Sequence, residues 1–377
     1  MDFLLEYAAF LLKAVTVVAA IVFVIGSIVS LKQRYKSGPG GHLVVKKLND
    51  ELDDFKEDLE IELYSEAELK LMDKERKKAE KAKDKAEKQR LKEKAKQAKH
   101  ADEQEADDEA SGAQEPEDEG DDERKKRVYV LDFNGDIQAS ETELLRHEIT
   151  AVLTMASTQD EIVLRLESPG GMVHSYGFAA SQLARIRNKN IPLTICVDHV
   201  AASGGYMMAT IANKIVAAPF AIVGSIGVVA TLPNFSKVLK KYDIDYEQFT
   251  AGEYKRTVTM FGENTQKAKD KFQADLEDTH VLFKQHISQY RPELKVEEVA
   301  TGEIWYGTQA LGKGLIDAVG TSDDYLVEAC KDADVYSVRY EFKKTLQERL
   351  GLAAQKGVEK AVLRMMSAVQ RHSQTKG

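Results

Sequence analysis

Apolar and polar residues are segregated into blocks along the chain, and the first block is strongly apolar. No charged residue occurs from Ala14 to Leu31, where Val, Ile, Ala, Leu and Phe predominate. Extended back to residue 8, with Lys13 as its one charge, the block has the length that a helix needs to cross a bilayer. Acidic residues precede it and basic residues follow it, which favours a retained anchor over a cleaved signal peptide. We predict a transmembrane helix over residues 8–31.

The second block, residues 32–126, is dominated by charge. Lys70–Lys99 is rich in Lys, Glu and Ala and predicts a solvated helix, whereas Asp102–Glu123 is acidic and interrupted by Gly and Pro. Blocks of this kind seldom fold alone, so we interpret the region as a charged linker, partly disordered or helical. Two alternatives stay open: binding to an anionic membrane surface, and pairing of the basic block with the acidic one.

Regular alternation of strands and helices begins near Arg127. The predicted strands cover residues 127–133, 161–168, 191–197 and 214–218, and the predicted helices cover 141–157, 173–188 and 204–213. Such alternation predicts an α/β domain with largely parallel strands, here placed at residues 127–341. Residues 342–377 carry apolar side chains at near-helical spacing. They predict an amphipathic helix or tail that packs on the domain, joins subunits or lies on a membrane surface.

Composition narrows the class of function. The 377 residues include 53 Lys and Arg against 62 Asp and Glu, a net charge of −9, which argues against a generally basic nucleic-acid binder. Cys196 and Cys330 are the two cysteines, too few for a disulfide-rich module or a cysteine-rich zinc site. The common metal and nucleotide motifs do not occur, so we expect no metal and no cofactor.

Two glycine-rich segments each follow a predicted strand and precede a predicted helix. They are SPGG at Ser168–Gly171 and AASGGY at Ala201–Tyr206. Ser203 resembles a serine exposed on a sharp nucleophile turn, although a serine there is also an ordinary helix N-cap. Amides at such turns can hold a developing oxyanion, and we assign this role to Gly170 and Gly204.

A nucleophilic serine needs a base, and the sequence does not single one out. Asp198 and His199 lie in the same turn as Ser203, which makes a Ser–His–Asp arrangement awkward, and His174 follows the SPGG segment. His280 and His286 lie in a long helical stretch and are expected to be exposed. A lysine can replace histidine when burial keeps it neutral, but composition cannot choose among the lysines.

The order SPGG, AASGGY, GSIGV (Gly224–Val228) and AGEYKR (Ala251–Arg256) resembles the signal peptide peptidase, or protease IV, family. With an anchor, a charged spacer and one protease unit, the chain is most similar to its SohB-type inner-membrane serine peptidases. The resemblance implies a ClpP/crotonase-like spiral of ββα units, with Ser203 as nucleophile and Lys255 as general base. It also implies that Ser225 orients Lys255, that Gly170 and Gly204 form the oxyanion hole, and that subunits assemble. Lys255 must then be desolvated, for which Tyr254 is a candidate.

The resulting hypothesis is a membrane-anchored serine endopeptidase of the bacterial inner membrane with a Ser–Lys dyad. Its expected partners are polypeptide substrates, the lipid bilayer and further copies of the chain, and not nucleic acid. Basic residues after the anchor favour a cytoplasmic peptidase domain. The alternatives are a crotonase-like acyl-CoA enzyme and a catalytically inert membrane scaffold.

Overall fold

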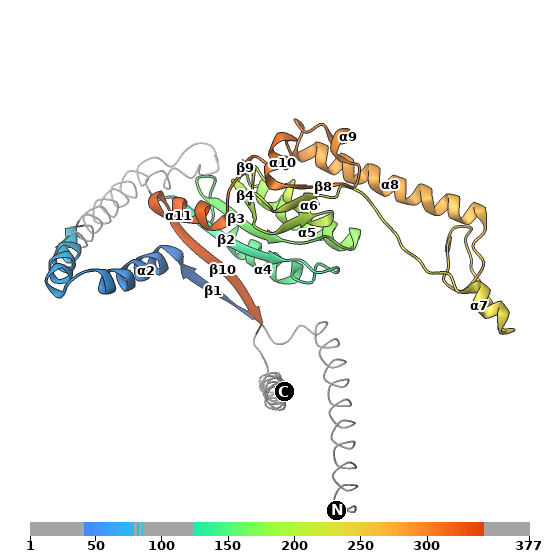
Figure 1. The fold of residues 1–377 in the computed structure, drawn as a ribbon, viewed down its shortest axis with the longest axis horizontal. Coiled ribbons are helices and arrows are strands. Elements are labelled where there is room, and N and C mark those ends of the chain that lie inside the picture. The colour runs from blue at the N-terminus through green and yellow to red at the C-terminus, as the bar shows by residue number, and fades with distance from the viewer. Residues whose placement is uncertain (1–40, 79–80, 83–84, 86–123, 343–377) are drawn as a thin grey trace, which may run out of the picture. The chain divides into compact units, whose positions relative to one another are not determined.

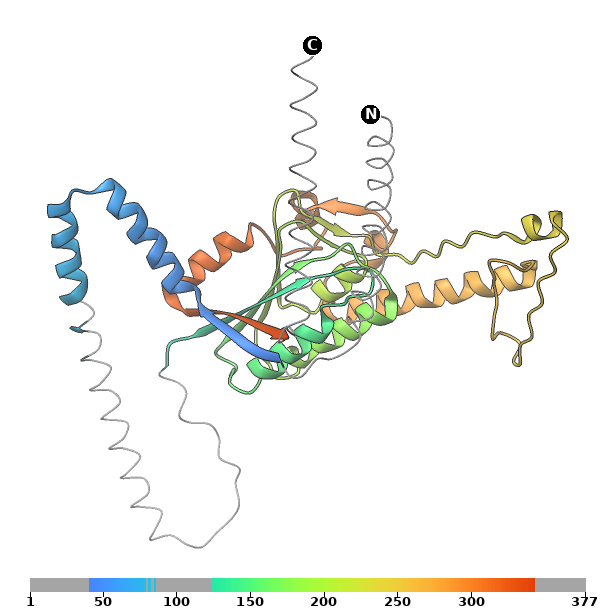
Figure 2. The same ribbon diagram turned by 90° about the horizontal axis from the view of Figure 1, so that it is seen from below.

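The computed structural model describes residues 41–78, 81–82, 85 and 124–342 (Figure 1 and Figure 2). By their contacts these residues fall into two units, one containing 41–44 and 339–342 and the other 45–338. The predicted transmembrane helix at 8–31 lies outside the described residues, as does the predicted C-terminal helix beyond residue 342. Among the described helices, none is both apolar enough and long enough to traverse a bilayer.

The described chain has a mixed α/β fold. The strands are β1 (Gly41–Lys47), β2 (Arg127–Asn134), β3 (Glu161–Glu167), β4 (Leu193–Val197), β5 (Val200–Ala202), β6 (Lys214–Ala217), β7 (Ile222–Gly224), β8 (Ile304–Tyr306), β9 (Ala318–Val319) and β10 (Asp334–Phe342). The helices are α2 (Leu48–Leu63), α4 (Thr142–Val152), α5 (Val173–Arg187), α6 (Gly204–Ala209), α7 (Ser236–Lys241), α8 (Gln266–Tyr290), α9 (Val296–Val299), α10 (Gly307–Gly312) and α11 (Ser322–Asp332). All seven strands and helices predicted between residues 127 and 218 are present, with shifted ends.

The strands form two sheets. The larger has the order β1-β10-β2-β3-β4-β6-β9, and every neighbouring pair from β10 to β9 is parallel. The smaller has the order β5-β7-β8, in which β5 and β7 are parallel and β7 and β8 antiparallel. The largely parallel pairing predicted from the sequence is therefore confirmed, and the antiparallel β8 is an addition to it.

Both faces of the larger sheet are covered, which explains the continuous apolar runs of its central strands. Along β2, Leu131 and Phe133 belong to one buried cluster, together with residues of α4, α5, α6 and α8. Val128 and Val130 point to the opposite face and join a second cluster that includes Leu326 of α11. The central strands thus bury apolar residues on both faces, and the second face also carries polar side chains such as the ion pair of Asp132 and Arg165.

Part of the predicted linker belongs to this fold. Between residues 32 and 126 the structure contains β1, at the edge of the larger sheet, and α2. At the start of α2, Asn49 Nδ2 donates hydrogen bonds to the carbonyl oxygens of Cys330 and Ala333, at 3.1 and 3.0 Å, and Asn49 Oδ1 accepts one from the Val335 amide at 2.8 Å. The high average charge of the region conceals this short ordered segment.

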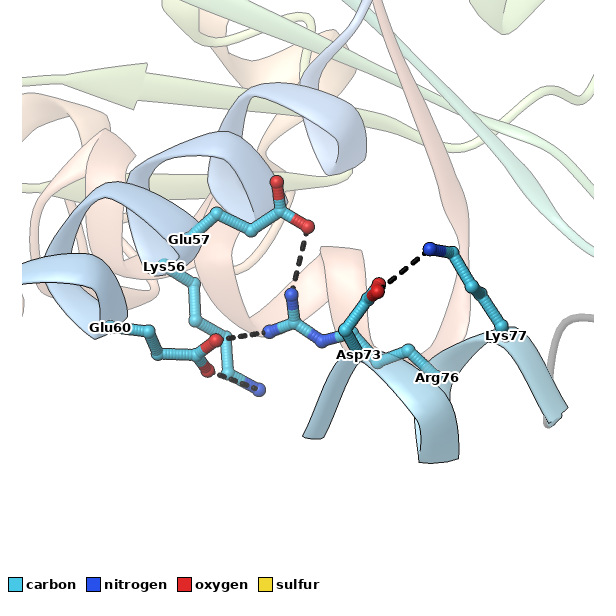
Figure 3. Close-up of polar contacts among 6 residues, drawn as sticks. All are labelled: Lys56, Glu57, Glu60, Asp73, Arg76 and Lys77. Atoms are coloured by element: carbon cyan, nitrogen blue, oxygen red, sulfur yellow. Dashed lines mark hydrogen bonds and ion pairs between the residues drawn. The ribbon is translucent and has the colours of Figure 1, made fainter. Parts of the chain in front are cut away.

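Further along the predicted linker, a helical segment at residues 66–78 exchanges ion pairs with α2 (Figure 3). Arg76 reaches Glu57 at 2.8 Å and Glu60 at 2.6 Å, and within the segment Lys77 pairs with Asp73 at 2.7 Å. The charged helix predicted over Lys70–Lys99 is confirmed at residues 70–78. The Arg76–Glu57 and Lys77–Asp73 pairs are exposed and contribute about 0–1 kcal/mol each, whereas the carboxylate of Glu60 in the Arg76–Glu60 pair is nearly buried.

The described chain resumes at Arg124, three residues before β2. Arg124 binds both carboxylate oxygens of the fully buried Asp160, at 2.7 and 2.5 Å. Burial raises the pKa of Asp160, but the hydrogen bonds from Arg124 and from the amides of Ser157 and Arg127 outweigh it, so the net shift is downward. This bidentate pair secures the entry of the chain into β2.

One extension leaves the body of the domain. In Figure 1 and Figure 2, α8 runs out past the sheets, and α7 and the segment leading into α8 lie near its N-terminal end. The buried residues of α8 are Phe283 and Ile287, both in its C-terminal half. We call residues 229–265 the arm. Its apolar side chains are largely exposed, with Val229 at 87% and Phe249 at 88%.

Candidate active site

The two glycine-rich turns lie side by side, as predicted. Ser168 follows β3 directly, and its amide donates to the Val200 carbonyl at 2.7 Å. The Ala202 amide donates back to the Ser168 carbonyl at 3.0 Å, which makes a parallel bridge between Ser168 and Ala201. Because this pairing continues the parallel register of the strands, the chain segments that leave them end at the same edge of the fold.

Ser203 sits on a sharp turn between β5 and α6. Its φ of 51° and ψ of −118° lie in a region that residues other than glycine rarely adopt. The conformation is held by the Ser203 amide, which donates to the Gly224 carbonyl at 2.8 Å. Although Ser203 occupies the N-cap position of α6, its side chain makes no capping hydrogen bond. The strained backbone and the half-buried hydroxyl, which does not cap the helix, are typical of a nucleophile turn and not of a simple N-cap.

Glycines at both turns allow backbones to approach that side chains would keep apart. A Cβ on Gly170, whose φ is +90°, would lie 2.8 Å from the Gly204 nitrogen and 2.8 Å from Ser203 Cβ. A Cβ on Gly204 would lie 2.4 Å from the ring of Tyr176. The two predicted oxyanion-hole residues and the predicted nucleophile are therefore adjacent.

The SPGG turn offers two amides, and only one was singled out from the sequence. The Gly170 amide donates to the Oγ of Ser168 at 3.1 Å, so an oxyanion would have to share or replace that acceptor. The next amide, of Gly171, has no hydrogen-bond acceptor within the described part of the chain. Gly171 is thus a second candidate donor, and the choice depends on a side-chain hydrogen bond that residue spacing does not reveal.

Ser225 lies on the turn that supports Ser203. It follows Gly224, which accepts the Ser203 amide hydrogen bond, and it has a φ of 51°. The Ser225 amide donates to the Glu303 carbonyl at 2.6 Å, which links this turn to the residues just before β8. The predicted supporting serine is therefore connected to the nucleophile turn through one backbone hydrogen bond.

Lys255 is not brought to this cluster. It lies in the arm, is exposed, and its amide donates to the Gly252 carbonyl at 3.2 Å. The expected desolvation by Tyr254 is wrong for a single chain. Tyr254 is 51% exposed, and the ammonium of Lys271 lies 5.5 Å from the centroid of its ring.

The histidines near Ser203 do not form a catalytic set. His199 and His174 are exposed, and the carboxylate of Asp198 accepts hydrogen bonds from the amide and hydroxyl of Ser322, at 2.8 and 2.5 Å. Asp198 therefore holds the start of α11 instead of orienting an imidazole. The difficulty foreseen for a Ser–His–Asp triad is confirmed by this arrangement.

His286 is half-buried, so its predicted exposure is wrong. Its Nε2 lies 3.0 Å from the carbonyl of Met207 in α6, and its ring packs against Tyr290. Burial lowers the pKa of His286, opposed in part by the hydrogen bond to Met207. This contact cannot be predicted from residue spacing, because it depends on how α8 packs against α6.

This contact predicts an acid-dependent loss of stability. In the unfolded chain His286 titrates near its ordinary pKa of about 6.5. The pKa of His286 is lower in the folded chain. As the pH falls through the ordinary pKa, the unfolded chain therefore binds more protons than the folded chain, and the free energy of unfolding decreases. The slope from this group is at most about 1.4 kcal/mol per pH unit. Denaturant unfolding between about pH 7.5 and about pH 5.5 measures it; a slope that is the same in His286→Gln would contradict the assignment.

A second prediction concerns the contact between the turns. Gly170→Ala places a Cβ against three backbone or backbone-bound atoms at 2.7–2.8 Å, so the turns must separate. We expect destabilisation of about 1–3 kcal/mol and a fall in kcat/KM of about 100-fold. Gly177→Ala, within α5 and with open space around its Cβ, is the matched control and should keep activity and gain up to about 1 kcal/mol. Equal activity of the two variants would exclude a role for this contact.

Comparison with known proteins agrees with the nucleophilic serine that these turns suggest. The family model "Peptidase family S49 N-terminal" matches residues 2–183, and the model "Peptidase family S49" matches residues 185–336. The chain belongs to peptidase family S49 and is a serine peptidase.

Several relatives in this family carry the name SohB. The probable protease SohB of Haemophilus influenzae is 49% identical over 94% of this chain and 94% of its own length. A probable protease SohB of Buchnera aphidicola subsp. Acyrthosiphon pisum is 51% identical over 64% of this chain and 72% of its own length. Among solved structures, a membrane-bound stomatin-specific protease mutant in complex with a substrate peptide matches with 17% identity and a TM-score of 0.37, over 60% of this chain and 96% of that one.

Proposed function

We propose that this protein is a membrane-anchored serine endopeptidase that hydrolyses peptide bonds with a dyad of Ser203 and Lys255. The observation that carries the proposal is the turn at Ser203. There a strained backbone presents a serine hydroxyl without a capping bond, next to the second glycine turn. Family membership supports the peptidase class, and the position of Lys255 in the AGEYKR segment supports its role as base.

The proposed reaction has two halves. Ser203 Oγ attacks the carbonyl carbon of the scissile peptide bond while its proton passes to the neutral amine of Lys255. The tetrahedral oxyanion accepts hydrogen bonds from the Gly204 amide and from the Gly170–Gly171 turn. When the intermediate collapses, the C–N bond breaks and Lys255 returns the proton to the leaving amine. Lys255 then deprotonates a water, whose attack on the ester releases the acyl product and restores Ser203.

Assembly into a homo-oligomer would complete this site. In a single chain Lys255 is exposed on the arm, whereas a lysine becomes an effective base only when it is desolvated. The exposed apolar side chains of the arm, such as Val229 and Phe249, are suited to burial against another subunit. We infer that a neighbouring copy covers the arm, and that Ser225 orients Lys255 there.

The proposal also covers the fold, the membrane location and the substrates of the protein. We infer a ClpP/crotonase-like arrangement of ββα units, built on the observed parallel sheet. The helix predicted over residues 8–31 would anchor the protein in the lipid bilayer of a bacterial inner membrane, with the peptidase domain on the cytoplasmic side. Extended polypeptides such as remnant signal peptides or membrane-protein fragments are the proposed substrates, and nucleic acid is not a proposed partner.

The test is cleavage of casein or a fluorogenic peptide by the purified full-length protein in detergent, with acyl-CoA conversion measured in parallel. We expect peptide cleavage alone, without added metal or cofactor. Conversion of an acyl-CoA without proteolysis would replace the proposal by a crotonase-like activity. Absence of both activities in a folded, assembled protein would favour an inert scaffold.

A further inference from the structure

Tyr176, in the first turns of α5, is a fully buried tyrosine that touches both glycine turns. Its hydroxyl donates to the carbonyl of Asp136 at 2.7 Å and lies 2.5 Å from the Oγ of Ser168. A carbonyl can only accept, so the one proton of the phenol goes to Asp136. The Ser168 hydroxyl must therefore donate to Tyr176, and it accepts in turn from the Gly170 amide at 3.1 Å.

These bonds form a chain with a single direction, from the Gly170 amide through Ser168 and Tyr176 to the Asp136 carbonyl. Burial raises the pKa of the Tyr176 phenol, so the hydroxyl keeps the proton that this direction requires. Ser168 is itself fully buried, and no water is needed to complete the chain. The conformation of the SPGG turn is thereby tied to one phenol oxygen.

The ring of the same tyrosine restrains the other turn. A Cβ built on Gly204 would lie 2.4 Å from Cγ of Tyr176, so the amide after the nucleophile rests directly on the ring. A Cβ on Gly135 would lie 2.5 Å from the Tyr176 hydroxyl and 2.4 Å from Ser168 Oγ. These groups are closely packed, so a movement of the phenol would displace both turns.

We propose that Tyr176 is a positioning residue for the oxyanion hole: its ring supports the Gly204 amide while its hydroxyl, through Ser168, fixes the Gly170 turn. The inference rests on the proposed function, because it assumes that the Gly204 amide and the Gly170–Gly171 turn bind the oxyanion. Hydrogen bonds to an oxyanion form fully only in the transition state, so a misplaced donor lowers kcat more than it raises KM. A tyrosine that merely fills the core would not produce this pattern.

The test is Tyr176→Phe in the full-length protein, which keeps the ring against Gly204 and removes only the hydroxyl. We expect kcat for peptide cleavage to fall about 10- to 100-fold with KM changed less than about twofold. Affinity for a peptide aldehyde, which forms a tetrahedral adduct with the serine, should fall in parallel with kcat. Tyr325→Phe is the matched control. Its hydroxyl bonds to Glu161 at 2.5 Å, away from both turns, and kcat should stay unchanged.

Ser168→Ala removes the other hydroxyl of the chain and should reproduce the effect. The double variant, with both Tyr176→Phe and Ser168→Ala, should be no slower than the slower single variant, because both substitutions interrupt the same chain of hydrogen bonds. If Tyr176→Phe does not fold, Ser168→Ala alone decides. The inference would be overturned by an unchanged kcat in either folded variant. It would also be overturned if Tyr325→Phe lowered kcat as much as Tyr176→Phe does. Cleavage that survives Ser203→Ala would instead overturn the proposed function, so the two failures are distinguishable.

Discussion

Ser203→Ala is expected to reduce kcat for peptide cleavage by about 10⁴-fold or more, with substrate binding largely retained. The substitution removes the nucleophilic oxygen and leaves the turn, the amides and the surrounding core unchanged. Steady-state hydrolysis of a fluorogenic peptide, with binding of the intact peptide measured separately, separates the two effects. Cleavage at the rate of the parent protein would exclude Ser203 as the nucleophile.

Ser203→Gly provides a matched comparison at the same position. The φ of 51° and ψ of −118° are strained for any residue with a Cβ but accessible to glycine. Both variants should lack activity, but Ser203→Gly should be more stable than Ser203→Ala by about 1 kcal/mol or more in denaturant unfolding. Equal stability would show that the turn is not strained, although the loss of activity would still identify the nucleophile.

Lys255→Arg is expected to lower kcat by about 10²- to 10⁴-fold, since it removes the general base and keeps the positive charge. An arginine remains protonated and cannot accept the proton of Ser203. Lys269→Arg, at another exposed lysine near the arm, is the control and should leave kcat unchanged. A Lys255→Arg variant with the activity of the parent would refute the dyad while leaving Ser203 in place.

The position of Lys255 adds a second part to this prediction. Figure 1 shows α6, which begins after Ser203, in the body of the domain, whereas the segment between α7 and α8 lies at the outer end of α8. We therefore expect co-expression of Ser203→Ala with Lys255→Ala to restore part of the activity, because a mixed oligomer can combine an intact serine with an intact lysine. Complete absence of restoration, in oligomers shown to be mixed, would mean that serine and lysine come from one chain.

The sequence predicted much of the fold because its central strands have a simple physical signature. Apolar runs such as residues 191–197 belong to strands buried on both faces, and the intervening helices alternate with them at regular intervals. β1 and α2 were missed because charge dominates their neighbourhood. Their order comes from contacts such as those of Asn49 with the residues before and in β10, which are about 280 positions away in sequence.

The site was predictable where the backbone dictates the residue type. Glycines at 170 and 204 are required by the close approach of two turns, and such requirements are visible as sequence motifs. The roles of Tyr176 and Ser168 were not visible, because a hydrogen-bonded chain depends on which hydroxyls face each other. Lys255 came only from the family resemblance, since nothing in its own neighbourhood distinguishes it from other exposed lysines.

The central claim is that Ser203 is an activated nucleophile. It is tested most directly by treating the full-length, assembled protein with a fluorophosphonate and mapping the adduct by mass spectrometry. The account predicts one adduct, on the peptide that contains Ser203, and its loss in Lys255→Arg but not in Lys269→Arg. An adduct on another serine, such as Ser168 or Ser225, or an unmodified Ser203 in a protein that cleaves peptides, would contradict it.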